Sequence, residues 1–160
     1  MRTPKRVLAL VMVILVAALT VPAAAQAATI YVNSGVSGAK LGMNDTTAAK
    51  KLGKVKKTWN DNEYGYLIEV RGFGTKSKSG DYSLYLYSNG KHKVTAFLIY
   101  SKRYVTKKSI HVGSTTKALK NAYKTGLHKT SDGYFLKSMT GRTHFEISKG
   151  KITSIWIWKI

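Results

Sequence analysis

Alternating apolar and polar positions run through most of the chain after residue 28, and this period of two predicts β-strands. Two of the alternating segments, 93–100 and 151–158, match position by position, and each follows a glycine-containing turn. Two shorter segments, 46–52 and 117–123, instead carry apolar residues four positions apart, which predicts short amphipathic helices. The chain is therefore expected to be mostly β, with two helices.

Each predicted helix is followed by the same series of elements. Four more alternating segments lie between the helices and the two matching strands, at 64–71, 81–88, 134–137 and 143–148. The order helix–strand–strand–strand therefore occurs twice, in a first repeat over about 29–101 and a second over about 109–160. The first repeat is longer because 71–80 is expected to form a long hairpin loop. Short strands are also expected before the helices, at 29–33 and 109–112.

These repeats predict an α+β fold. Two tandem units, each a helix plus antiparallel strands, are expected to form one curved antiparallel sheet with the short helices on one face. The sequence does not fix which sheet face the helices cover, and the candidates for the covered face include Leu84, Leu86, Val94, Ala96, Leu98, Phe145, Ile147, Ile152, Trp156 and Trp158. The opposite face is expected to carry Tyr85, Tyr87, Phe97, Ile99, Ile155 and Ile157. A wet sheet face usually reads polar, so this second face is expected to lie under loops or to meet a partner.

The first 28 residues have the pattern of a secretory signal peptide. Three cations precede an apolar run over 7–21, and small residues follow it. Cleavage after Ala25 and cleavage after Ala27 satisfy the small-x-small pattern equally well. The run is short for a bilayer-spanning helix, which needs about 20 apolar residues, so cleavage is preferred to a retained anchor. The remainder, 29–160, is expected to be a single secreted, extracellular domain.

The composition after residue 28 is basic and free of cysteine. Without cysteine, disulfides, a lipid-modified cysteine and thiol-ligated metals are excluded. The first 28 residues hold three of the 27 Lys and Arg and none of the seven Asp and Glu, which leaves 24 against 7, a net charge of +17. This charge favours a monomer and an acidic protein, an anionic wall polymer or a membrane surface as partner. Nucleic acid is chemically possible, but secretion makes it the less natural partner.

The residues around the first predicted helix resemble a known signature. Gly-Met-x-x-x-x-Ala over 42–48, followed by Leu52-Gly53, is similar to the helix motif of the BamE (SmpA)-like outer-membrane assembly lipoproteins. The tandem repetition, with closing strands that begin Lys-(Val/Ile)-Thr, resembles the β-lactamase inhibitory protein fold. The resemblance implies a saddle-like sheet whose exposed face grips another protein. The namesake of that fold has disulfides and a face of mixed charge, so the resemblance implies a binding surface without naming its partner.

Catalytic and metal-binding patterns are scarce. The seven carboxylates are scattered and the four histidines lie far apart in the sequence. Asp61 and Glu63 share a loop whose calcium-binding pattern is incomplete, so an ordinary turn is expected there. His144 and Glu146 share one strand face, where a surface hydrogen bond is preferred to acid–base chemistry. We therefore expect no enzyme activity, no metal and no cofactor.

Binding signals are stronger than catalytic ones. The candidate residues are a loop tryptophan, side chains of the second sheet face and nearby cations: Trp59, Tyr85, Tyr87, Phe97, Ile99, Ile155, Ile157, Lys54, Lys56, Lys57, Lys102 and Arg103. The leading hypothesis is a secreted, basic, non-catalytic binding protein that engages a protein or an anionic envelope partner, with inhibition as one form of that binding. The alternative is a cationic antimicrobial protein, of bacteriocin type, that acts on anionic bacterial envelopes. A hydrolase of wall polymers is the third hypothesis.

Overall fold

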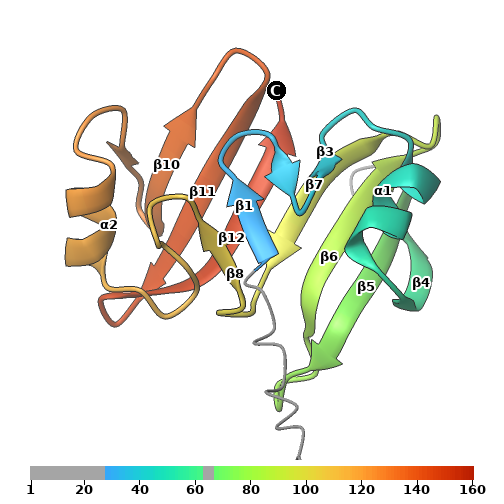
Figure 1. Ribbon diagram of the computed structural model, residues 1–160, viewed down its shortest axis with the longest axis horizontal. Helices are drawn as coiled ribbons and strands as arrows, with labels where there is room; N and C mark the ends of the chain where they lie inside the picture. Colours follow the sequence, from blue (N-terminus) through green and yellow to red (C-terminus); the bar gives the residue numbers. More distant parts are fainter. Residues whose placement is uncertain (1–27, 63–66) are drawn as a thin grey trace, which may run out of the picture.

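The computed structural model of the protein describes residues 28–62 and 67–160. These residues form an α+β fold with two short helices and two β-sheets (Figure 1). The predicted signal peptide lies outside the described residues apart from Ala28, and so does Glu63. The beginning of the strand expected at 64–71 lies outside them as well.

The larger sheet has eight strands, and each strand runs antiparallel to its neighbours. From edge to edge its strands are β4 (Val55–Asp61), β5 (Ile68–Lys76), β6 (Tyr82–Asn89), β7 (Val94–Ile99), β12 (Lys151–Lys159), β11 (Gly141–Ser148), β10 (Gly133–Lys137) and β9 (His128–Lys129). The two segments that match in sequence, β7 and β12, pair with each other at the centre, where Phe97 lies opposite Ile157.

Both predicted helices are present, within one residue of their expected bounds. Helix α1 spans Asp45–Leu52 and helix α2 spans Thr116–Ala122. The side chain of Asn44 accepts two backbone hydrogen bonds at the start of α1, and that of Thr115 accepts one at the start of α2. These side-chain oxygens satisfy N–H groups that have no partner within the helix, which is why the helices begin there.

The turn before each helix is tied to a closing strand of the large sheet in the same way. Gly42 N donates to Val94 O at 2.8 Å, and Gly113 N donates to Ile152 O at 2.8 Å. Both glycines have a positive φ, of 77° and 95°, a conformation that a residue with a side chain rarely adopts. The two helices are therefore fixed to equivalent positions at the starts of β7 and β12.

A second, smaller sheet of four strands was not predicted as a sheet, although the strand expected at 29–33 is present in it as β1 (Ala28–Tyr31). Its order is β3 (Ala39–Lys40), β2 (Gly35–Val36), β1 and β8 (Tyr104–Thr106), and β1 runs parallel to β8. The strand expected at 109–112 is therefore replaced by β8, because a tight turn follows Thr106. In that turn Thr106 N donates to Ile110 O at 2.9 Å, and Ile110 N donates to Thr106 Oγ1 at 3.1 Å.

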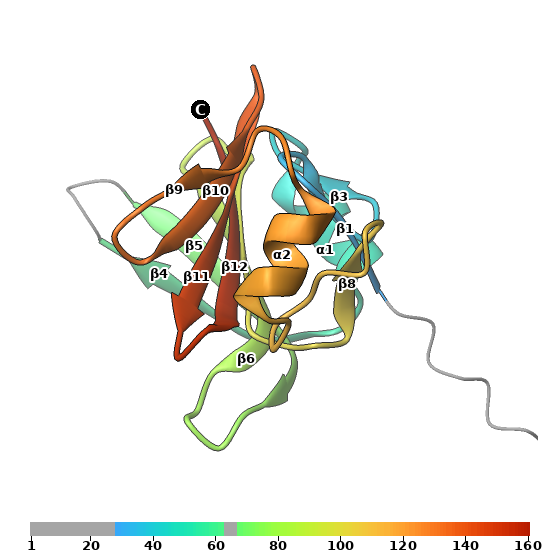
Figure 2. The same cartoon turned by 90° about the vertical axis from the view of Figure 1, so that its left-hand side faces the viewer.

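The helices and the small sheet cover one face of the eight-stranded sheet and leave its other face open (Figures 1 and 2). The core lies between these layers and includes Phe73, Phe97, Tyr104 and Phe145, each no more than 2% exposed. Burying one such side chain contributes about 1.5–3 kcal/mol to folding. In Figure 2 the outer strands β4 and β9 lie farther from the helices than β12 does, so the open face is concave.

The two central strands have the opposite alternation from the expected one. Four side chains expected on the open face are instead fully buried under the helices and the small sheet: Phe97, Ile99, Ile155 and Ile157. Four that were expected under the helices lie on the open face, in register with Tyr85 and Tyr87 or with one another: Ala96, Leu98, Trp156 and Trp158. The face assignment from simple alternation is therefore wrong for these eight residues of β7 and β12, whereas Val94 and Ile152 are buried as expected.

A β-bulge in each central pairing explains this reversal. In β7 both Val94 and Phe97 are fully buried although they lie three positions apart, and Ile152 and Ile155 repeat this spacing in β12. The register of β7 against β6, and of β12 against β11, shifts at these places. The extra residue of a bulge moves every following side chain to the other face.

Each half of the large sheet contains one strand more than expected. The additional strands are the two edges, β4 and β9. β4 carries the exposed residues Lys56 and Lys57, and lysines of this kind are typical of an edge that does not pair with another chain. The long loop expected at 71–80 is mostly strand, because β5 continues to Lys76.

Candidate functional site

The open face of the large sheet is lined by aromatic rings. We call this surface the aromatic face and define it by Trp59, Tyr82, Tyr85, Tyr87, Tyr100, Phe135, His144, Trp156 and Trp158. Residues directly opposite each other in neighbouring strands share a face. The register therefore places Trp59 opposite Val70 and Val70 opposite Tyr87, on the same side as Tyr85.

Tyr85 occupies the centre of a ring cluster on the β4–β7 half of the aromatic face. Its ring meets those of Trp59, Tyr82 and Tyr100 edge-on, with centroids 5.8, 5.9 and 6.0 Å apart. Close packing leaves little room beside the cluster: a Cβ at Gly72 would lie 2.5 Å from the ring of Tyr82. Edge-to-face contacts hold such rings in fixed orientations, so this half of the face is preorganised.

The hydroxyl of Tyr85 is itself fixed by hydrogen bonds. It accepts one from Tyr82 N at 2.9 Å and donates one to Asp81 Oδ1 at 3.3 Å. Burial raises the pKa of Tyr85, and the nearby charge of Asp81 raises it further. Burial also raises the pKa of Tyr100, together with the charges of Asp81 and Glu146. Both phenols are therefore neutral at physiological pH.

The β9–β12 half of the face combines rings with cations. The guanidinium of Arg142 lies 4.5 Å from the centroid of Phe135 and 5.6 Å from that of Trp158. Its Nε atom is buried and forms no hydrogen bond within the described part of the chain. Lys137 lies directly across from Arg142 on β10, so two cations occupy this end of the face. Arg142 was not predicted as a site residue. Its position in the sequence between two segments with aromatic residues was the signal that indicates it.

His144 and Glu146 do not form the hydrogen bond with each other that was preferred from the sequence. His144 Nε2 instead lies 3.3 Å from Asp132 Oδ1 and 3.2 Å from Thr130 Oγ1. Glu146 accepts a hydrogen bond from Ser154 Oγ at 2.6 Å. A hydrogen bond from Thr130 lowers the pKa of Asp132, and the neighbouring His144 lowers it further, against an opposing effect of desolvation. The two residues therefore have separate partners and form no acid–base pair.

The predicted binding cations are dispersed. Lys57 Nζ lies 5.7 Å from the ring centroid of Trp59 on the aromatic face. Lys102 lines a small cavity together with Tyr82 and Tyr100 at the edge of that face. Lys54, Lys56 and Arg103 are exposed, and Arg103 stacks on Tyr104, which lies on the helix-covered side. Of the predicted residues, the structure therefore brings together Trp59, Tyr85, Tyr87, Lys57 and Lys102.

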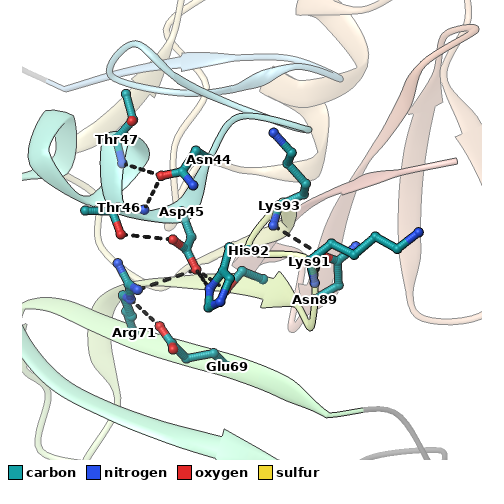
Figure 3. Close-up of polar contacts among 11 residues, drawn as sticks. Asn44, Asp45, Thr46, Thr47, Glu69, Arg71, Asn89, Lys91, His92 and Lys93 are labelled. Carbon is teal, nitrogen blue, oxygen red and sulfur yellow. Dashed lines mark hydrogen bonds and ion pairs between the residues drawn. The ribbon is translucent and has the colours of Figure 1, made fainter.

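A buried carboxylate anchors α1 to the large sheet on the side away from the aromatic face (Figure 3). Asp45 is 1% exposed, and its Oδ2 lies 3.4 Å from Arg71 Nη2 and 3.1 Å from His92 Nδ1. Ser88 and Thr46 each donate a hydroxyl hydrogen bond to the same carboxylate. Arg71 also pairs with Glu69.

The charge of Asp45 is stabilised by these partners. Burial alone raises the pKa of Asp45, but the His92 hydrogen bond, the Arg71 charge and the two hydroxyls together outweigh it, so the pKa lies below its ordinary value. A first-turn acid beside an Asn cap was the only signal of this cluster in the sequence, because Arg71 and His92 come from distant segments. The cluster links α1 to β5 through Arg71 and to β6 through Ser88.

The geometry of the described residues supports neither a metal site nor a membrane-spanning helix. Across 28–62 and 67–160, no three His, Cys, Asp or Glu side chains gather closely enough to hold a metal ion. Within the same residues, neither helix has the length and apolar character needed to cross a bilayer. The aromatic face is therefore the most developed candidate site in the described part of the chain.

Comparison with known proteins shows a likeness in fold. No family model matches the chain, and no curated protein matches it. Among solved structures, the uncharacterized protein YfeY from Escherichia coli is similar, with a TM-score of 0.50 over 81% of this chain and 95% of that one. The two sequences are 11% identical, so the similarity concerns the fold alone.

Proposed function

We propose that the chain is a secreted, non-catalytic binding protein that engages an extracellular protein partner through its aromatic face. The observation that carries this proposal is the network of ring contacts on the face of the large sheet that neither the helices nor the small sheet covers. Tyrosine and tryptophan combine apolar area with hydrogen-bonding groups, and both are enriched in protein interfaces. A face that only met water would be polar at these positions.

The tandem-repeat interpretation supports the proposal. A helix followed by four antiparallel strands occurs twice, and the two series meet at β7 and β12. We infer that the chain is built from two copies of one unit, whose joined strands provide a face wide enough for a protein partner. A concave sheet of this kind is also what the resemblance to the β-lactamase inhibitory protein fold implies.

A protein is favoured over an anionic polymer because the face is more aromatic than basic. Cations, among them Lys57, Lys76 and Arg142, lie at its rings, whereas Arg103 stacks on Tyr104 on the helix-covered side. An attachment driven by charge alone would be screened at physiological salt, where the Debye length is about 8 Å. Recognition by packed rings is far less sensitive to salt.

A pull-down from culture supernatant and cell-wall extract tests the proposal. The chain with Tyr87→Ala and Trp156→Ala is compared with the unaltered chain at low salt and at about 0.3 M salt. A specific protein partner is expected with the unaltered chain at both salt concentrations and is expected to be lost with the double variant. Tyr31→Ala, which removes an exposed ring from the opposite side of the molecule, is the matched control and is expected to retain the partner. Recovery of no partner, or equal recovery with both variants, contradicts the proposal.

A cationic antimicrobial function is the second candidate, and one observation favours it. Throughout the described segments, no lysine forms an ion pair with a carboxylate, so the positive charge is available to anionic surfaces. Dye leakage from vesicles rich in anionic lipid, compared with zwitterionic vesicles at low ionic strength, tests it. Absence of leakage from the anionic vesicles would eliminate this candidate.

A further inference from the structure

A cavity of about 380 Å³ lies on the helix-covered side of the molecule, between the small sheet and the end of α2. Its walls include Ile30, Tyr31, Val32, Lys107, Lys108 and Tyr123. No residue of the aromatic face lines it, so it is a separate site. Its volume lies at the lower end of the roughly 300–1,000 Å³ typical of small-molecule sites.

The floor of this cavity is apolar and rigid. Ile30 is 1% exposed and belongs to the core. The ring of Tyr123 packs against Phe145 with centroids 5.9 Å apart. Burial raises the pKa of Tyr123, so its phenol stays neutral. An apolar group of a ligand therefore meets aliphatic and aromatic carbon in the cavity.

The rim of the cavity is cationic. Lys107 Nζ lies 5.9 Å from the ring centroid of Tyr31, and Lys108 Nζ lies 4.8 Å from that of Tyr123. Lys108 Nζ also donates to Ala122 O at 2.7 Å, which holds it beside the end of α2. Both lysines belong to the hydrogen-bonded turn that follows β8, so their backbone positions are fixed.

No carboxylate balances these two charges, because no acidic residue is among those that line the cavity. An ammonium group donates strong hydrogen bonds to a carboxylate oxygen, and the rings beneath it leave its outer side free for one. A ligand that combines an anionic group with an apolar body would therefore match both the rim and the floor of the cavity. A cationic or uncharged molecule with an alkyl chain can contact the apolar floor, but it offers the two lysines no negative charge.

We propose that this cavity binds a free amphipathic carboxylate, a small molecule with one carboxylate on an alkyl or aromatic body. The apolar body packs against Ile30, Tyr31 and Tyr123, and the carboxylate accepts hydrogen bonds from Lys107 and Lys108. This inference goes beyond the proposed function and does not depend on it, because the cavity and the aromatic face lie on opposite sides of the large sheet.

Titration with octanoate, followed by backbone amide shifts in nuclear magnetic resonance spectra, tests this proposal. The amides of Ile30, Tyr31, Lys107 and Lys108 are expected to shift with saturation. Octan-1-ol and octyltrimethylammonium carry the same alkyl chain without the negative charge and are expected to bind at least about tenfold more weakly, as one charge-assisted hydrogen bond predicts. The proposal would be overturned if the cavity bound octan-1-ol or octyltrimethylammonium as tightly as octanoate.

Matched variants separate the site from general charge attraction. Lys107→Ala with Lys108→Ala is expected to weaken octanoate binding at least about fivefold. Lys78→Ala with Lys91→Ala removes the same charge from two exposed turns away from the cavity and is expected to leave the affinity within about twofold. All four lysines are exposed, so circular dichroism is expected to show both variants folded. Equal weakening in both variants, or none in the first, would refute the carboxylate site.

Discussion

Tyr87 of β6 and Trp156 of β12 stack with ring centroids 5.9 Å apart, although β7 runs between their strands. The residue of β7 opposite Tyr87 is Ala96, whose small side chain leaves space for the two rings to meet. The β-bulge of each central strand brings Ala96 and Trp156 to this face. The contact therefore connects the rings of the first four strands with those of the last four.

We expect this contact to be measurable as a coupling free energy. A double-mutant cycle with Tyr87→Ala and Trp156→Ala, followed by urea unfolding, is expected to give about 0.5–1.5 kcal/mol of coupling, as is typical of aromatic pairs. Three strands, β5, β6 and β7, separate Trp59 of β4 from Trp158 of β12, so their alanine variants are expected to be additive. Additivity of Tyr87→Ala and Trp156→Ala would contradict the stacked arrangement.

Gly72 is expected to be essential for the tyrosine cluster. A Cβ at this position would lie 2.5 Å from Tyr82 Cδ2, so Gly72→Ala is expected to displace the ring and destabilise the fold by about 1–3 kcal/mol. The near-ultraviolet circular dichroism of the tyrosines is expected to weaken as well. Gly90→Ala is the control, because a Cβ there meets nothing within 4 Å, and its effect is expected to stay within about 0.5 kcal/mol.

Asp45 is expected to give the fold an acid-sensitive component of stability. Its pKa in the folded chain lies below the ordinary value of 3.8, so its contribution is present above that pH and is lost as pH falls through the folded pKa. Asp45→Asn is expected to lower the free energy of unfolding at pH 7 by about 2–3 kcal/mol, because it leaves buried donors without their charged acceptor. The difference in free energy of unfolding between the Asp45→Asn variant and the unaltered chain is expected to become smaller below pH 3.8. Urea unfolding across pH 3–7 measures this narrowing, and a constant difference would contradict it.

The reversed alternation of β12 predicts which of its residues support the core. Ile155 is fully buried, so Ile155→Ala is expected to cost about 2–5 kcal/mol of stability. Thr153 is exposed two positions earlier, and Thr153→Ala is expected to change stability by less than about 0.5 kcal/mol. Thermal unfolding of both variants checks this pair. Comparable losses of stability in the Ile155→Ala and Thr153→Ala variants would indicate that β12 has no bulge between Ile152 and Ile155.

Local patterns were sufficient to predict much of the architecture. Asn44 and Thr115 are good helix caps, and the helices begin there. The similarity of 93–100 and 151–158 correctly marked two strands of one antiparallel sheet. The small sheet was not predictable in this way, because its strands are two to four residues long and depend on the parallel pairing of β1 with the distant β8.

The candidate site was only partly predictable, for a similar reason. Tyr85 and Tyr87 lie on the predicted face because they precede the bulges in the chain. Trp59 was predicted as a binding residue in a loop, and it joins them from the unpredicted strand β4. Phe97 and Ile155 do not lie on the predicted face, since a single inserted residue reverses the alternation after it. A bulge is set by the hydrogen bonding of both strands, and alternation within one strand contains no signal for it.

The strands that meet at β7 and β12 follow the same order outward on both sides, yet their open-face residues differ. The half from β4 to β7 presents the hydroxyl-bearing ring cluster around Tyr85, and the half from β9 to β12 presents Arg142 and His144. A molecule laid across this sheet meets neutral phenols at one end and a guanidinium and an imidazole at the other. A ligand that bound across this face would therefore make different contacts from the same ligand turned by half a revolution.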